Sequence, residues 1–346
     1  MRPIRLIQVG MGGWGRNWAG LLARQEELAQ PVAYVDVQPE MLRQLQREVG
    51  VSAALCFPSL EAALEASDGE AVLVTTPLAD HVPVAMAALE AGRHVLVEKP
   101  FAPSVAEAQQ AVELAAARGR VLMVSQNYRF YPAVQAAAAL VREGVLGPVS
   151  GVSVQFRKYA NTQPPGAHRH YSIRQPLLID MAIHHFDLMR LVLDQEPERV
   201  SCYAWNPPWS HFVEPAAAQA TITFDRGAVV DYRGSWVSTG TPTPWAGVWQ
   251  IEGAEGVLEW TSRGDAAADA EAVTLRPRGK RARRVSLPEL PYSDRLGALA
   301  AFAAAVQDGS EPPASGQDNV GSLALMMATV EAATTGQPQA VQAKRA

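Results

Sequence analysis

The stretch from Ile4 to Leu22, IRLIQVGMGGWGRNWAGLL, indicates a buried strand, a glycine-rich turn and the start of a helix. The apolar run from Ile4 to Val9 is typical of a parallel strand that is covered on both faces. In the turn, Gly10 would allow the tight bend, Gly12 the approach of a diphosphate to the backbone, and Gly15 close packing of helix on strand. The N-terminus of the following helix would then receive the diphosphate.

A second predicted strand, Val32 to Val35, gives this turn its context because it ends at Asp36. Asp36 follows Gly15 by about 20 residues, which is where an acid binds the ribose hydroxyls of a dinucleotide. The carboxylate would repel a 2′-phosphate, and Val37-Gln38-Pro39 offers no arginine to receive one. We therefore expect NAD as the cofactor, in preference to NADP.

The chain as a whole changes character once along its length. From Ile4 to about Ser125, strand and helix patterns alternate, as in a doubly wound parallel sheet. The second half has alternating apolar and polar runs between turn residues, as in an antiparallel sheet. Two alanine-rich helices follow, roughly Asp294 to Val306 and Asp318 to Thr334. We predict an α/β fold with an N-terminal Rossmann domain (1–126) and a C-terminal α+β domain (127–346) with a mostly antiparallel open sheet. The C-terminal helices could pack back on the first domain.

Composition sets the class of protein. The 346 residues are 48% hydrophobic, enough for two cores, and the net charge of −5 argues against nucleic acid or an anionic membrane as a partner. Cys56 and Cys202 indicate no disulfide framework. The chain shows no signal peptide and no run of about 18 apolar residues, so we expect a cytoplasmic protein outside the membrane. The basic run Arg276–Arg284 contains Pro277 and Gly279, which favours a solvated hairpin tip.

The segment Leu177–Leu193, LLIDMAIHHFDLMRLVL, is apolar nearly all round and predicts a buried helix. At about 100° per residue, His184 lies roughly 40° from Asp180 and Asp187 roughly 20° on the other side. A buried carboxylate must be paired or face a wet pocket, so this face is either a structural Asp–His pair or a catalytic one. His185 lies about 140° from Asp180, which favours packing.

Polar residues also follow three predicted strands, where ligands bind in open α/β sheets. Glu98-Lys99-Pro100 follows HVLV, and Thr75-Thr76-Pro77 follows AVLV, with His81 four residues further on. Gln126-Asn127-Tyr128-Arg129 follows VLMVS. These side chains would lie beside a bound dinucleotide.

Taken together and in this order, the motifs resemble the glucose–fructose oxidoreductase / inositol dehydrogenase (Gfo/Idh/MocA) family. The resemblance rests on Gly10-x-Gly12-x-x-Gly15, Thr76-Pro77-x-x-x-His81, Glu98-Lys99-Pro100, Asn127-Tyr128-Arg129-Phe130 and Asp180-x-x-x-His184-x-x-Asp187. It implies a bound nicotinamide dinucleotide, a site at the domain junction, and a homodimer or homotetramer paired through the second sheet. By motif match, the catalytic residues are Lys99, Asp180 and His184. The cofactor contacts would be Gly10, Gly12, Gly13, Trp14, Gly15, Asp36, Thr75, Thr76, Pro77, His81, Glu98, Lys99 and Asn127.

The chain departs from the family pattern at the entry to the predicted helix. The family often has Gly-Gly there, whereas this chain has Arg174-Gln175-Pro176, and Ala182 replaces the usual glycine two residues after Asp180. These changes reshape the rim of the pocket, so no relative's substrate can be copied. Candidate substrate contacts are Lys99, Arg129, Arg157, His168, Asp180 and His184.

The remaining side chains have plainer readings. His168 and His170 have no Cys or acidic partner at ligand spacing, so we expect a loop over the substrate and no metal. Most tryptophans of the second half should fill the sheet core or an oligomer face.

The leading hypothesis is an NAD-dependent oxidoreductase that moves hydride between the nicotinamide and a secondary alcohol of a sugar, cyclitol or derivative. Lys99 or His184 would take the hydroxyl proton, and Asp180 would orient the imidazole. Two alternatives stay open: a glycosidase that retains NAD and oxidises its substrate transiently, and a non-catalytic sensor of dinucleotide and sugar.

Overall fold

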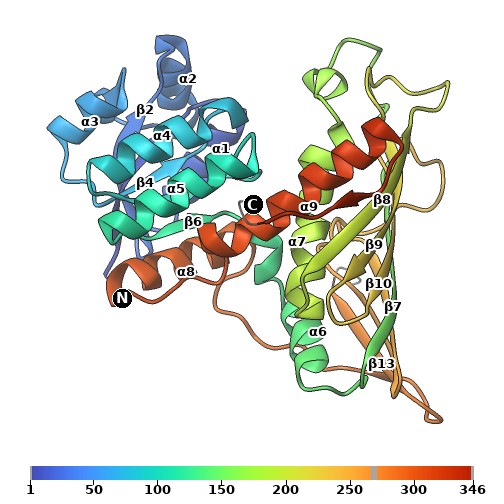
Figure 1. Ribbon diagram of the computed structural model, residues 1–346. Helices are drawn as coiled ribbons and strands as arrows, with labels where there is room; N and C mark the ends of the chain where they lie inside the picture. Colours follow the sequence, from blue (N-terminus) through green and yellow to red (C-terminus); the bar gives the residue numbers. More distant parts are fainter. Residues whose placement is uncertain (1, 266–270, 344–346) are drawn as a thin grey trace. The chain divides into compact units, whose positions relative to one another are not determined.

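The computed structural model describes residues 2–265 and 271–343, and the chain divides into two compact units. The first unit consists of Met1–Gln126 and Arg295–Val320, and the second of Asn127–Asp294 and Gly321–Ala346. Each unit has a sheet of its own (Figure 1).

The sheet of the first unit is parallel throughout its described strands. Its order is β3-β2-β1-β4-β5-β6. The chain adds strands on one side of β1 and then, from β4 on, on the other side, which marks a doubly wound fold. Strand β4 is buried at every position, as a strand covered on both faces must be. The predicted Rossmann sheet is confirmed. The strands are β1 (Ile4–Val9), β2 (Ala29–Val35), β3 (Cys56–Phe57), β4 (Ala71–Val74), β5 (His94–Val97) and β6 (Leu122–Val124).

Helices connect these strands, and their ends follow from local chemistry. Ser104 caps α5, where its Oγ accepts a hydrogen bond from the Glu107 backbone amide at 3.2 Å, as the capping box predicts. Pro39 opens α2 at its first position. The helices of this unit are α1 (Gly13–Leu22), α2 (Pro39–Val49), the short η1 (Ala53–Leu55), α3 (Leu60–Ala66), α4 (Leu78–Glu90), α5 (Val105–Arg118), nearly all of α8 (Asp294–Asp308) and the start of α9 (Gly316–Thr335).

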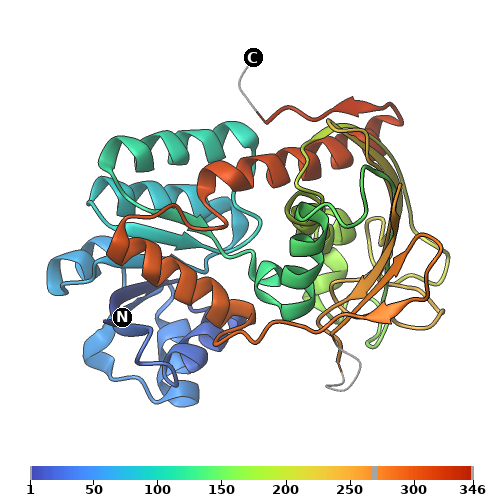
Figure 2. The same ribbon diagram turned by 90° about the horizontal axis from the view of Figure 1, so that it is seen from below.

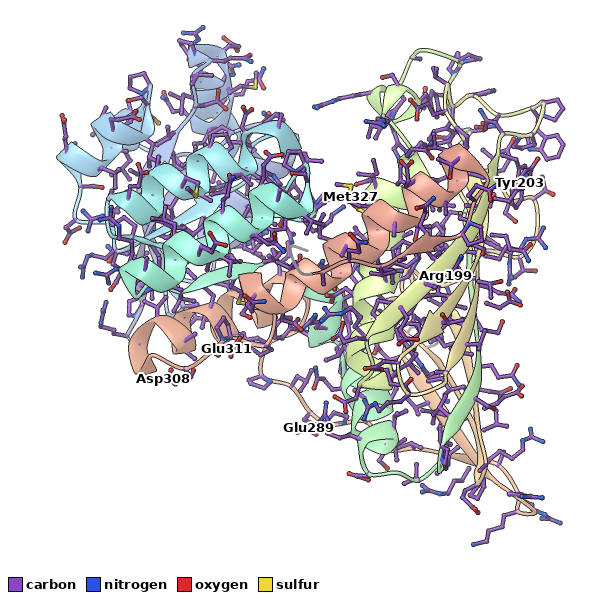
Figure 3. The ribbon with its side chains drawn as sticks, viewed as in Figure 1. Arg199, Tyr203, Glu289, Asp308, Glu311 and Met327 are labelled. Carbon is purple, nitrogen blue, oxygen red and sulfur yellow. The ribbon has the colours of Figure 1, made fainter. Side chains whose placement is uncertain are left out.

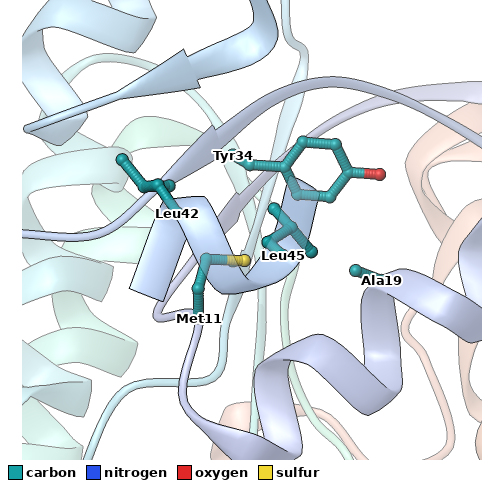
Figure 4. Packing of buried hydrophobic residues seen from close by; sticks show 5 residues of the cluster. All are labelled: Met11, Ala19, Tyr34, Leu42 and Leu45. Carbon is teal, nitrogen blue, oxygen red and sulfur yellow. The ribbon is translucent and has the colours of Figure 1, made fainter. Parts of the chain in front are cut away.

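A cluster of buried side chains packs α1 and α2 against β2 (Figure 4). Met11 and Ala19 contribute from the glycine turn and α1, Tyr34 from β2, and Leu42 and Leu45 from α2. All five are less than a tenth exposed. This packing holds the glycine turn beside the end of β2, where Asp36 begins the next connection.

The sheet of the second unit is antiparallel except between β10 and β7, which run parallel. Its order is β14-β13-β12-β11-β7-β10-β9-β8-β15 among the described residues, and the predicted mostly antiparallel sheet is confirmed. The turn between β13 and β14 contains Gly279 at φ +71°, so the basic run does form a hairpin tip. The strands are β7 (Val149–Arg157), β8 (Pro197–Trp205), β9 (Ala217–Phe224), β10 (Val229–Ser235), β11 (Val248–Gly253), β12 (Gly256–Thr261), β13 (Ala272–Pro277), β14 (Arg283–Arg284) and β15 (Gln339–Ala340).

One face of this sheet is covered by helices, as Figure 2 shows for α6 (Pro132–Arg142) and α7 (Ala182–Leu193). Along β10, Tyr232 is fully buried toward α7, whereas its neighbour Arg233 is exposed on the outer face. The outer face also exposes Tyr203, labelled with Arg199 on β8 in Figure 3. The unit's other helical segments are η2 (Asn127–Phe130), η3 (Arg169–Ser172), η4 (Pro176–Met181) and the remainder of α9.

The predicted single helix from Leu177 to Leu193 is wrong in its first turns. The segment Pro176–Met181 is a π-helix, and the backbone amide of Ala182 donates to the carbonyl of Leu177, five residues back. A π-turn holds more residues than an α-turn, so the 100° projection does not apply between Asp180 and His184.

Two further findings concern the chain as described. Cys56 and Cys202 are free thiols. No helix in residues 2–265 or 271–343 is long and apolar enough to span a membrane.

Candidate active site

Two glycines of the first turn are required by packing. Gly10 has φ +95°, and a Cβ there would lie 2.7 Å from the backbone nitrogen of Thr76. A Cβ on Gly15 would lie 1.9 Å from the carbonyl oxygen of Gly10. Gly12 and Gly13, in contrast, face open space at the start of α1, which has no side-chain cap. The uncapped amides and open backbone fit a diphosphate.

Asp36 is held in place by the backbone at both carboxylate oxygens. Oδ2 accepts from the amide of Met11 at 2.7 Å, and Oδ1 accepts from the amide of Gln38 at 2.8 Å. Each oxygen keeps a lone pair for a ribose hydroxyl. Val37, which follows, is 80% exposed.

Trp14, in the first turn of α1, is 47% exposed and contacts an arginine for which the sequence contains no signal. The guanidinium carbon of Arg295, in α8, lies 4.5 Å from the Trp14 ring centroid and 5.1 Å from that of Trp18. This adds a cation beside the predicted diphosphate site.

At the end of β4, two predicted cofactor residues brace the surrounding loops, and a third has a buried hydroxyl without a hydrogen-bond partner among the described residues. Thr75 is buried and donates its hydroxyl to the carbonyl of Gly10 at 2.7 Å, which fixes the glycine turn. The ring nitrogens of His81 lie 2.8 Å from the carbonyl of Pro100 and 3.0 Å from that of Thr76. Burial lowers the pKa of His81, although the hydrogen bonds to the two carbonyls act to raise it. Within the described chain, the buried hydroxyl of Thr76 has no hydrogen-bond partner.

The ends of β5 and β6 repeat this division. Glu98 accepts from the indole nitrogen of Trp18 at 2.7 Å and from the amide of Lys99 at 3.2 Å, so it braces α1 against the strand. Lys99 is half-buried just beyond it. Gln126, at the end of β6, is fully buried, and neither atom of its amide finds a partner among the described residues. Buried polar groups are normally paired, so Gln126 and Thr76 are suited to a polar ligand such as a dinucleotide.

In the second unit, His184 lies in an aromatic stack. Its ring is parallel to that of Tyr128, with centroids 4.0 Å apart and planes 7° apart. Asp180, in the π-turn, is 39% exposed at its side chain, and its Oδ2 lies 3.7 Å from Nε2 of His170. The sequence gives no signal for this contact between His170 and Asp180.

His185 packs in the core of the second unit. Its Nδ1 lies 3.1 Å from the Tyr232 hydroxyl and its Nε2 lies 2.9 Å from the carbonyl of Trp245. Burial lowers the pKa of His185 to about 4, so the ring is neutral at pH 7.

Asp187 and Arg129 form a buried ion pair within the second unit. Both guanidinium–carboxylate distances are 2.6 Å, and the side chains are 1% and 4% exposed. Ser322, in α9, donates to Asp187 at 2.8 Å and accepts from Arg190 at 2.9 Å. The pair thus fastens α7 to η2 and α9.

A second arginine missed by the sequence analysis, Arg263, lies beside Tyr128. Its Nη1 donates to the Tyr128 hydroxyl, and its Nε donates to the Tyr131 hydroxyl at 3.2 Å. Burial raises the pKa of Tyr128, which keeps that hydroxyl protonated. Asn127, a predicted cofactor contact, donates its side-chain amide to Asp294.

Two candidate substrate residues lie elsewhere in the second unit. Arg157 lines a cavity of about 430 Å³ on the outer face of the sheet, together with Trp205, Trp209 and Arg233. His168 is exposed and accepts from the amide of His170 at 3.2 Å. Trp236 and Trp249 are buried core residues, whereas Trp205 and Trp209 border this cavity.

Comparisons with known proteins cover both units. Residues 4–126 match the description "Oxidoreductase family, NAD-binding Rossmann fold", and residues 134–259 match "GFO/IDH/MocA C-terminal domain". The chain is 25% identical over 349 residues to a 1,5-anhydro-D-fructose reductase of Ensifer adhaerens, covering 96% of this chain and 99% of that one. It is 27% identical over 344 residues to a D-apiose dehydrogenase of Paraburkholderia graminis, covering 95% and 87%.

A solved structure shares the fold. An oxidoreductase from Agrobacterium radiobacter, crystallised with NAD+, L-tartaric acid and magnesium, is 19% identical with a TM-score of 0.84, over 98% of both chains. The two family matches follow each other in the order that the sequence motifs predict. The chain therefore belongs to the Gfo/Idh/MocA family of oxidoreductases, and residues 4–126 are the family's NAD-binding Rossmann domain.

Proposed function

We propose that this oxidoreductase transfers hydride between NAD and a secondary alcohol of a sugar, cyclitol or related derivative. The observation that carries the proposal is the imidazole of His184, held flat in a buried stack on a chain with an NAD-binding domain. The names of two relatives, a 1,5-anhydro-D-fructose reductase and a D-apiose dehydrogenase, support a sugar-like substrate.

The residues that would hold the cofactor belong to the first unit. Gly12 and Gly13 leave space for a diphosphate, and Asp36, which the Met11 amide holds in place, would accept hydrogen bonds from the ribose hydroxyls. The Thr76 hydroxyl and the Gln126 amide have no other partners in the described chain and would hydrogen-bond the nicotinamide end. When bound, NAD supplies the hydride acceptor.

Lys99 or His184 would accept the proton of the reacting hydroxyl, so both are candidate bases. Lys99 belongs to the first unit and His184 to the second. Asp180 would orient the imidazole of His184 and fix its tautomer.

The test is a screen of polyols, aldoses, uronic acids and inositols for NADH formation, run beside a glycoside-cleavage assay. With the best substrate, Lys99→Ala and His184→Ala should each lower kcat by about 10²–10⁴-fold and leave the Kd of NAD nearly unchanged. Asp180→Asn should cost less. The double variant Lys99→Ala/His184→Ala should lose less than the product of the singles, because residues that act as one unit are non-additive.

Matched controls come from residues away from the carboxyl ends of the parallel strands. Lys280→Ala changes a lysine in the hairpin between β13 and β14, and His94→Asn changes a histidine at the amino end of β5. Both should keep wild-type turnover. Full turnover in all three single variants of Lys99, Asp180 and His184 would refute the assignment, and sugar release without NADH would favour the glycosidase.

A further inference from the structure

The stack between Tyr128 and His184 has no assigned role in proton transfer. Both rings are buried, with exposures of 3% and 6%. An imidazole on a helix is free to turn about its side-chain bonds unless neighbours restrict it. A parallel ring at 4.0 Å fixes the plane in which the ring nitrogens of His184 lie.

Tyr128 is itself held by Arg263. The guanidinium donates to the Tyr128 hydroxyl, and its carbon lies 4.6 Å from the Tyr128 ring centroid. The ring is therefore fixed at its hydroxyl end as well as on its face.

The backbone of Arg263 is held in an uncommon conformation that aims this side chain. Its φ is +58°, a left-handed value that costs free energy in a residue other than glycine. Glu271 compensates, because its Oε1 accepts from the Arg263 amide at 2.7 Å and from the Ser262 hydroxyl at 2.6 Å. Its Oε2 accepts from the Ala133 amide at 2.9 Å, which ties this loop to the first turn of α6.

The contacts close into a circuit. The carbonyl of Arg263 accepts from the amide of Trp245 at 2.9 Å, and the carbonyl of Trp245 lies 2.9 Å from Nε2 of His185. His185 is the chain neighbour of His184, whose ring meets Tyr128. Both the backbone and the side chain of His184 are thus anchored to the same loop.

We propose that Tyr128 is a positioning residue, which sets the ring plane of His184, and that Arg263 holds Tyr128 in place. The inference rests on the proposed function, in which His184 faces the reacting hydroxyl. Proton transfer requires the base within hydrogen-bond reach in the right orientation, so loss of the stack acts on turnover more than on binding.

The experiment compares Tyr128→Leu, which removes the ring, with Tyr128→Phe, which keeps the ring and removes the hydroxyl. Tyr128→Leu should lower kcat by about 10–100-fold with KM and the Kd of NAD nearly unchanged. Tyr128→Phe should recover most of that loss, and Arg263→Gln should fall between the two. Tyr159→Leu, at a half-exposed tyrosine outside the circuit, is the matched control and should turn over normally.

A second readout does not depend on a substrate. In protein labelled with ¹³C-histidine, the ring protons of His184, one of seven histidines, should be shifted upfield by the Tyr128 ring. The shift should persist in Tyr128→Phe and vanish in Tyr128→Leu, with the resonance assigned from His184→Gln.

The outcomes separate the two proposals. Unchanged kcat in Tyr128→Leu, or equal losses in Tyr128→Leu and Tyr128→Phe, would overturn the positioning role. Full turnover in His184→Gln would instead overturn the proposed function of His184. An unshifted His184 resonance in the wild type would overturn the stack itself.

Discussion

The ion pair between Arg129 and Asp187 offers a sharp test of what holds the second unit together. Asp187→Leu removes a carboxylate that accepts two hydrogen bonds from Arg129 and one from Ser322, all at 2.6–2.8 Å. The guanidinium, 4% exposed, would then be buried without its counter-charge. Removing one partner of a buried pair costs about 3–5 kcal/mol.

The double variant Arg129→Met/Asp187→Leu removes both charges and keeps comparable volume. It should be more stable than Asp187→Leu alone, because no uncompensated charge remains in the core. For a unit of this size, about 2–4 °C per kcal/mol predicts a fall in Tm of about 6–20 °C for the single variant.

Differential scanning calorimetry measures both changes, and NAD binding confirms that the first unit is intact in each variant. The reasoning would be refuted if the double variant melted no higher than Asp187→Leu. In that case the pair would contribute packing and not charge compensation.

Four further predictions follow from single features. Asp36→Ser with Val37→Arg should shift cofactor preference from NAD toward NADP, measured as the ratio of the two dissociation constants; an equal or lower Kd for NADP in the wild type would contradict the role of Asp36. Gln175→Gly should raise the free energy of unfolding in urea by about 1 kcal/mol, because Gln175 has φ +44°, which glycine adopts without strain; an unchanged or lower value would contradict this reasoning. The pKa of His185 is lowered to about 4, so below pH 6.5 the unfolded chain binds a proton that the folded chain does not bind. The free energy of unfolding should therefore fall by about 3 kcal/mol from pH 6.5 to pH 4, and His185→Gln should reduce that fall. Light scattering at micromolar concentration should give the mass of a dimer or tetramer, since Tyr203, Val229 and Val248 are exposed on the second sheet, and a monomer mass would rule it out.

The dinucleotide site could be predicted from sequence because its determinants are close together in the chain. Gly10 and Gly15 belong to one strand–turn–helix unit, and Asp36 directly follows the next strand. Strand and helix periods place these residues without knowledge of the rest of the fold. The same applies to the cap at Ser104.

The surroundings of His184 could not be predicted in this way. Tyr128 and Arg263 are 135 residues apart, and the second sheet brings them together. Arg263 belongs to no helix or strand, so no periodicity indicates where its side chain points. The sequence also gives no signal for the π-turn before Ala182, because Pro176 at a first turn is compatible with an ordinary α-helix.

The motif Asp180-x-x-x-His184-x-x-Asp187 shows what spacing can and cannot establish. Spacing indicated three polar side chains on an otherwise apolar segment, and those that are buried need a partner in a region of low dielectric. It could not say whether a partner belongs to the protein or to a ligand. Asp187 is satisfied by Arg129 and Ser322, deep inside the unit, whereas Asp180 is more than a third exposed beside His170. Exposure therefore distinguishes the two carboxylates: that of Asp187 is buried and fastens α7, whereas that of Asp180 keeps contact with solvent.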